Sequence, residues 1–129
     1  MFRGEDVDYN WRCIKAGYKV LSFPDIKVYH HHRATWKGLY NQQYMYGRAY
    51  LLVRRKWKDM YCCYPHGIHS LRDLAKFCYF CIVPFIDQAH KLKYVKGFFN
   101  KLIAYPIMLT LGYNWHRGVL VQFFKELKR

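Results

Sequence analysis

Acidic residues are scarce in this sequence, and most of them lie near its start. The chain of 129 residues has 22 Lys and Arg against 8 Asp and Glu, which gives a formal charge of +14. Five of the acids precede residue 60, so the second half is strongly basic. Such a surface repels cationic partners and attracts nucleic acid or an anionic membrane face. No nucleic-acid-binding motif accompanies the charge, so we expect no nucleic-acid partner.

A long uncharged hydrophobic run is also lacking, although 53% of the residues are apolar and 20% are aromatic. No stretch reaches the roughly 18 charge-free residues expected of a spanning helix. The two best candidates, residues 77–86 and 102–115, are short, and each contains a proline. Because they are short and broken by proline, these segments fit helices on a membrane surface or a re-entrant hairpin better than a clean span. A short tilted span stays an alternative.

A secretory signal peptide and an even set of cysteines are both missing. The five cysteines therefore indicate reduced thiols and, with the basic tail, a place on the cytoplasmic side of a membrane. Cys78 and Cys81 form a CxxC, but it lies within the apolar run FCYFCIVPFI. We expect buried, unreactive thiols there rather than a redox or zinc site.

The apolar periodicity predicts a chain that is mostly helical by residue count. Helices are expected at 6–16, 36–57, 71–91, 94–111 and 118–128. Gly17 is the expected C-terminal cap of the first helix. In the second, Gln43 and Gly47 interrupt an aromatic stripe, which indicates a polar contact and a close approach by another element. The alternative is a satisfied core glutamine beside a packing glycine.

Two short strands are expected between the first two helices, at 19–23 and 26–30, with a turn at Pro24-Asp25 between them. Side chains alternate along a strand. His30 would therefore share the apolar face of the second strand with Val28, and would point toward a core or a site.

Residues 4–49, GEDVDYNWRCIKAGYKVLSFPDIKVYHHHRATWKGLYNQQYMYGRA, closely resemble the C-terminal part of the catalytic domain of family 2 glycosyltransferases. The resemblance combines an acidic pair before a helix, an AGY turn, an FPD turn, a VYH strand end and a QQYMYGRA helix. It implies an α/β fragment. Residues 1–57 would be the C-terminal part of a GT-A fold, and residues 58–129 a basic, aromatic, membrane-associated helical tail.

The resemblance also implies roles for individual residues. Members transfer a sugar from a nucleotide-sugar donor to an acceptor hydroxyl with inversion, and the acceptor is a lipid-linked group or a glycan. The acidic pair matches Glu5 and Asp6, with Asp6 as general base. His30 would help bind a divalent metal, Mg²⁺ or Mn²⁺, or the diphosphate, with His32 as its competitor. The implied substrate-binding residues are Gln43, Arg12 and His32.

The chemistry suits these residue types. A hydroxyl is a weak nucleophile, so a carboxylate must accept its proton as the new bond forms. A carboxylate also stabilises the oxocarbenium-like transition state, and a divalent cation balances the departing diphosphate. The structural alternative for Asp6 is a helix N-cap contributing about 1 kcal/mol. For His30, a solvated strand end is an equal alternative.

Three departures from the family pattern limit the activity expected of this chain. Asp6-Val7-Asp8 spells DxD, but at a helix start rather than at a strand end, so we interpret it as coincidence. The QxxRW motif of processive members is absent, which favours transfer of single sugars. No donor-binding half precedes the acidic pair, so we expect the chain alone to be incompetent. The rival interpretation is a non-enzymatic, basic, membrane-surface module that retains a glycosyltransferase remnant.

Overall fold

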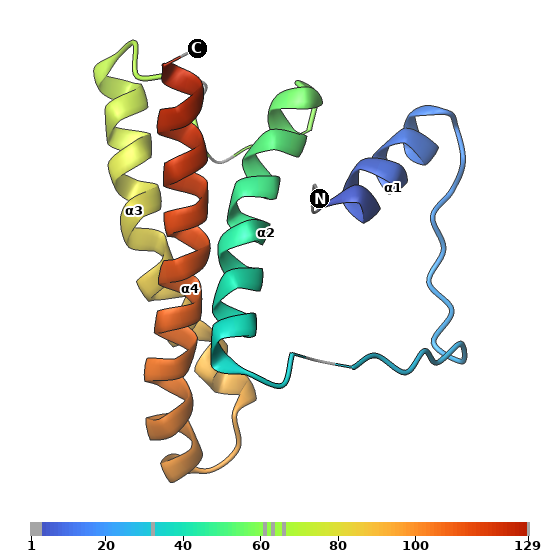
Figure 1. Ribbon diagram of the computed structural model, residues 1–129, viewed down its shortest axis with the longest axis vertical. Helices are drawn as coiled ribbons and strands as arrows, with labels where there is room; N and C mark the ends of the chain where they lie inside the picture. The colour runs from blue at the N-terminus through green and yellow to red at the C-terminus, as the bar shows by residue number, and fades with distance from the viewer. Residues whose placement is uncertain (1–3, 32, 61, 63, 66, 129) are drawn as a thin grey trace.

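A computed structural model describes residues 4–31, 33–60, 62, 64–65 and 67–128, without the side chains of residues 84 and 85. Its elements are α1 (Glu5–Lys15), α2 (Trp36–Lys56), α3 (Leu71–Lys91), the short 3₁₀ helix η1 (Leu92–Tyr94) and α4 (Phe98–Leu127). Helix α4 packs against both α2 and α3, while α1 lies beside the C-terminal end of α2 (Figure 1). The expectation of a mostly helical chain is confirmed.

Local sequence signals start and end these helices. At the end of α1, the amide of Gly17 donates to the carbonyl of Ile14, and the amide of Tyr18 donates to the carbonyl of Cys13, both at 3.0 Å. Gly17 has a φ of 86°, which glycine adopts without strain, so the predicted C-terminal cap is confirmed. Side-chain caps begin the next two long helices, Thr35 for α2 and Ser70 for α3.

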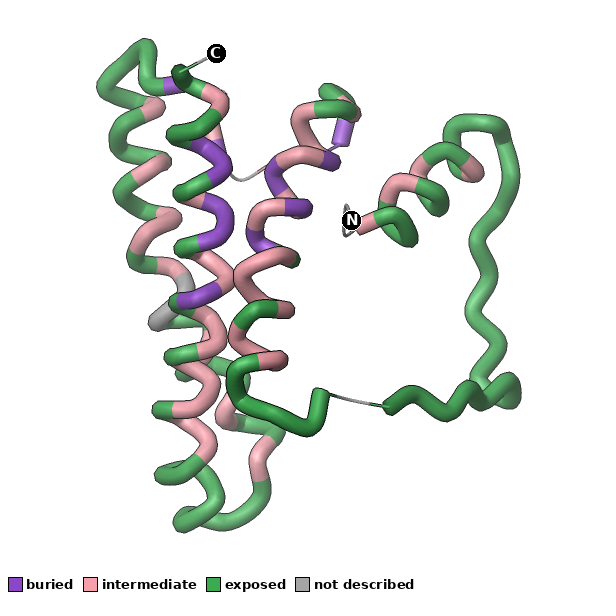
Figure 2. Tube along the Cα trace, viewed as in Figure 1, coloured by how far each residue is buried: buried purple, intermediate pink, exposed green. Residues whose placement is uncertain are grey.

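The core lies where α2 and α4 cross. The largest fully buried side chains are Leu51, Val53, Val119 and Phe123, and Figure 2 shows the buried stretches of the two helices facing each other. A Cβ added to Gly47 would lie 1.9 Å from the carbonyl oxygen of Trp115, and one added to Gly118 would lie 2.1 Å from that of Tyr44. The two backbones therefore touch, which confirms the close approach predicted at Gly47.

A row of polar contacts runs along the same interface. The Arg48 guanidinium donates from Nε and Nη2 to Oε1 of Gln122, at 3.2 and 3.1 Å. Gln122 in turn donates to Glu126 at 2.8 Å, and Glu126 pairs with Arg55. The buried amide of Asn114 donates to the carbonyl of Tyr40. These contacts satisfy polar groups that would otherwise be costly to bury.

Helix α4 corrects the prediction of two helices at 94–111 and 118–128, because it is continuous from Phe98 to Leu127. The residues between these two ranges are helical as well, and the glycines at 112 and 118 are packing positions. A Cβ on Gly112 would meet the side chain of Gln88 at 3.1 Å, and Gly118 lies against α2. Pro106 sits within the helix. Packing on two neighbouring helices outweighs the weak local propensity.

The two predicted strands are wrong. Residues 18–23 and 26–31 form no regular structure, although the turn at Pro24-Asp25 is present, with the amide of Ile26 donating to the carbonyl of Phe23 at 3.2 Å. Val28 is 84% exposed, and Tyr29 is 98% exposed. A strand needs a neighbour to pair its backbone groups, and no described segment pairs with these residues. The apolar face proposed for His30 is therefore solvent-exposed.

The structure also bears on the membrane helices and the buried cysteines expected in the second half of the chain. The described helices include none that is both long enough and apolar enough to cross a bilayer. Cys78 is exposed and Cys81 half-buried, so burial of the CxxC is wrong for Cys78. Burial raises the pKa of the Cys81 thiol, and the neighbouring Cys78 raises it further.

Packing of α2 against α4 joins residues on both sides of the domain boundary predicted at 57, and that boundary stays a prediction.

Candidate active site

Asp6 lies at a cavity of about 390 Å³ between α1, α2 and α4. The rings of Tyr50 and Trp115 meet edge to face there, with centroids 5.1 Å apart. The guanidinium of Arg54 lies 4.0 Å above the centroid of the Tyr50 ring. Other lining residues are Gly4, Val7, Tyr46, Ala49 and Val53. A carboxylate, a guanidinium and aromatic rings thus border one space.

Gly4 allows this close approach of α1 to α2. It precedes the helix with a φ of 105°, in the left-handed region that favours glycine. A Cβ at this position would lie 3.4 Å from side-chain atoms of both Ala49 and Val53. The glycine that opens the motif therefore has a structural role: it turns the chain into α1 against the surface of α2.

Asp8 holds α1 in place. Its carboxylate accepts from Nζ of Lys56 at 2.7 and 3.0 Å and from Nε1 of Trp57 at 2.7 Å, and Arg12 lies 3.5 Å away. Hydrogen bonds from Lys56 and then Trp57 lower the pKa of Asp8. A second ion pair joins Lys15 to Asp59. The sequence showed the Asp8–Arg12 spacing, but nothing in it pointed to the contact across to residues 56 and 57.

Asp6 and Glu5 are both exposed in the first turn of α1. Oδ1 of Asp6 accepts a hydrogen bond from the amide of Val7 at 2.9 Å. Gly4 is the residue at the N-cap, so the alternative that Asp6 is the N-cap is wrong. Both acids still stabilise the positive end of the helix dipole. Glu5 is absent from the residues that line the cavity, whereas Asp6 is among them.

Gln43 lies in a neighbouring cavity of about 540 Å³, and Tyr50 and Trp115 line both cavities. The structure thus brings Asp6 and Gln43 to adjacent spaces that share an aromatic pair. The guanidinium of Arg12 instead lies over the ring of Tyr9, with 5.9 Å between its Cζ and the centroid. His30 is on the exposed segment outside the bundle, and His32 lies outside the described residues.

The predicted metal finds no complete site in the described part of the chain. No group of three or more His, Cys, Asp or Glu side chains there is placed to hold an ion. Asp6 borders the cavity while His30 belongs to the open segment, so this pair does not form the ligand set that Mg²⁺ or Mn²⁺ requires. The cation stays a prediction.

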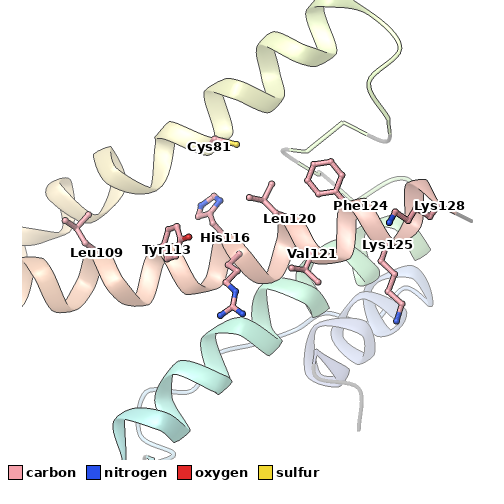
Figure 3. Close-up of a pocket in the computed structure, with 10 residues that line it drawn as sticks. Cys81, Leu109, Tyr113, His116, Leu120, Val121, Phe124, Lys125 and Lys128 are labelled. Carbon is pink, nitrogen blue, oxygen red and sulfur yellow. The ribbon is translucent and has the colours of Figure 1, made fainter.

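A histidine that the sequence analysis did not single out lies between α3 and α4. Nδ1 of His116 is hydrogen-bonded to the hydroxyl of the buried Tyr64. Burial lowers the pKa of His116 to about 4, so its ring is neutral at pH 7. His116, Leu120 and Phe124 line a groove of about 610 Å³ and point toward the α3 side, where Cys81 lies (Figure 3). The groove is apolar with basic residues at its rim, and its lining includes none of the predicted site residues.

Comparison of the chain with protein-family models, with curated proteins and with solved structures finds no match in any of the three. The resemblance to family 2 glycosyltransferases therefore depends on the motifs of residues 4–49 alone.

Proposed function

We propose that this chain supplies the acceptor side of an inverting sugar-transfer site, as part of a family 2 glycosyltransferase, with Asp6 as the general base. The observation that supports the proposal best is the cavity beside Asp6. It combines an exposed carboxylate with three aromatic rings and an arginine. Flat rings offer apolar faces for the C–H face of a sugar, and a few polar groups fix its orientation.

In this reaction the acceptor hydroxyl attacks the anomeric carbon of the donor while its proton passes to the carboxylate of Asp6. The new C–O bond forms as the bond to the nucleoside diphosphate breaks, and the configuration inverts in one displacement. Tyr50 and Trp115 would hold the acceptor ring. Arg54, positioned over Tyr50, would hydrogen-bond an oxygen of the acceptor, since a guanidinium offers several donors in one plane.

The second candidate is a non-enzymatic membrane-surface module that retains a transferase remnant. One observation favours it. Residues 18–31, which carry the FPD and VYH motifs, are exposed and run outside the bundle (Figure 1). His30 lies on this segment, and neither His30 nor Arg12 is among the residues that line the cavity beside Asp6. A site assembled only from the described residues lacks the part that would hold the donor.

A transfer assay with the full-length polypeptide that carries this sequence distinguishes the two candidates. Asp6→Asn keeps the size of the side chain but removes the base, so we expect transfer to fall by roughly 10²–10⁴-fold while nucleotide-sugar binding is kept. Asp25→Asn, an exposed acid in the turn, is the matched control and should retain full activity. Full turnover in Asp6→Asn would exclude the base role, and absence of transfer by the unmodified protein would favour the module.

A further inference from the structure

The turn between α3 and α4 exposes an apolar cluster. Phe98 and Phe99 are 71% and 77% exposed, and their rings meet edge to face with centroids 5.8 Å apart. Every residue from 98 to 103 is exposed, so the start of α4 projects beyond the bundle. We name this cluster the tip, and its large side chains are Tyr94, Phe98, Phe99, Leu102 and Ile103. Soluble monomers rarely expose contiguous apolar clusters of this kind without a use for them.

Four lysines lie close in the sequence to the apolar residues of the tip. Its lysines are Lys91, Lys93, Lys96 and Lys101, all exposed. The sequence contains no acidic residue from 88 to 125, so Asp87, which pairs with Lys91, is the nearest acid along the chain. Lys93 lies over the ring of Tyr94, with its Nζ 4.9 Å from the centroid. These four exposed lysines flank or lie among the apolar residues of the tip along the chain, and we name them the lysine collar.

We propose that the tip inserts into the surface of an anionic lipid bilayer. Phenylalanine and branched aliphatic side chains would enter the boundary between headgroups and acyl chains, where burial of apolar area is favourable. The lysine collar would face the anionic headgroups, which attract basic residues close to the surface. A second copy of the chain is a poor occupant because it would bring two sets of lysines together. A nucleic acid would pair with the lysines but leave Leu102 and Ile103 uncovered.

The attachment is peripheral, in keeping with the absence of a crossing helix from the described helices. The C-terminal lysines lie at the opposite end of α4 (Figure 1). Phe98 and Trp115 are separated by 17 positions of one helix, which is about 25 Å along its axis. The cavity at Trp115 would thus stand clear of the headgroups when α4 is upright. The inference concerns a surface separate from that cavity and does not depend on sugar transfer.

Co-sedimentation with vesicles tests the proposal on the 129-residue chain. The unmodified chain should bind vesicles of mixed phosphatidylcholine and phosphatidylglycerol, and bind neutral phosphatidylcholine vesicles far more weakly. The triple variant Lys93→Gln, Lys96→Gln, Lys101→Gln should bind anionic vesicles roughly a hundredfold more weakly, because each lysine near the surface contributes about fivefold. Phe98→Ser with Phe99→Ser should lose about tenfold or more by removing the inserted rings.

The matched control lies at the other end of α4. Phe124→Ser with Lys125→Gln and Lys128→Gln changes an exposed ring and two cations there, and it should leave vesicle binding within about twofold. Circular dichroism confirms that each variant stays helical. Equal loss in the control would show that the charge acts without a specific site and would overturn the proposal. Tighter binding to single-stranded DNA than to anionic vesicles, or tip-dependent dimers in lipid-free buffer, would overturn it as well.

Discussion

Helix α2 contacts two very different neighbours. Along its inner face, α2 lies against α4 in a core of fully buried side chains such as Leu51, Val119 and Phe123. Beyond its C-terminal end, α2 meets α1, which has no buried residue and is attached mainly by Asp8 and Lys15. The first contact combines a buried apolar core with partly buried polar contacts, whereas the second depends on ion pairs at the surface.

Most of the motifs on which the family resemblance depends lie outside the core. The motifs of residues 4–31 lie on α1 and the open segment, while the buried side chains lie on α2, α4 and the loop at Tyr64. Apolar burial supplies most of the stability of a fold, and exposed ion pairs supply little. The helical bundle is therefore expected to fold as the stable unit, with α1 docking onto it afterwards.

The largest expected effect comes from the centre of the core. Phe123→Ala should lower the free energy of unfolding by about 4 kcal/mol, because it removes a fully buried ring and leaves a cavity. Phe99→Ala is the matched control in the same helix. Its ring is 77% exposed, so the change should stay within about 0.5 kcal/mol. Urea denaturation followed by circular dichroism measures both. Equal losses would contradict the location of the core.

A second variant tests the backbone contact between α2 and α4. Gly118→Ala should cost about 3 kcal/mol, since the added Cβ would lie 2.1 Å from the carbonyl oxygen of Tyr44 and force the helices apart. Gly112→Ala in the same helix meets only the flexible side chain of Gln88. Better helix propensity should make that variant neutral or stabilise it by up to about 1 kcal/mol. The same denaturation curves apply, and a neutral Gly118→Ala would exclude the tight crossing.

Much of this arrangement could be predicted from local patterns. The bounds of α2 and α3, the glycine cap of α1 and the close approach at Gly47 all follow from periodicity and from residues with special backbone freedom. These signals lie within a few residues of the feature they predict, so one sequence is enough to read them.

The errors concern contacts between distant residues. Residues 19–30 have the composition of strands but no partner in the described chain, so their propensity is not realised. The break predicted between residues 111 and 118 is wrong because nothing in the sequence showed that α2 and α3 would pack along this stretch. The anchoring of Asp8 by Lys56 and Trp57 spans nearly 50 positions, and no local pattern reports such a distance. Asp6 was found through its motif, but the aromatic pair beside it was not.

The smallest expected effect concerns the docking of α1. Asp8→Ala removes the carboxylate that accepts from Lys56 and Trp57, so hydrogen exchange of α1 amides should accelerate while the unfolding midpoint of the bundle stays unchanged. Glu5→Ala, an exposed acid in the same helix, should leave the docking intact.

Low pH should have the same effect as Asp8→Ala, because the pKa of Asp8 is lowered in the folded state. The ionised carboxylate therefore favours docking fully above the ordinary pKa of about 3.9. This contribution is lost as the pH falls through the lowered pKa. Loss of the bundle together with α1 at that pH would show that the two regions form one cooperative unit.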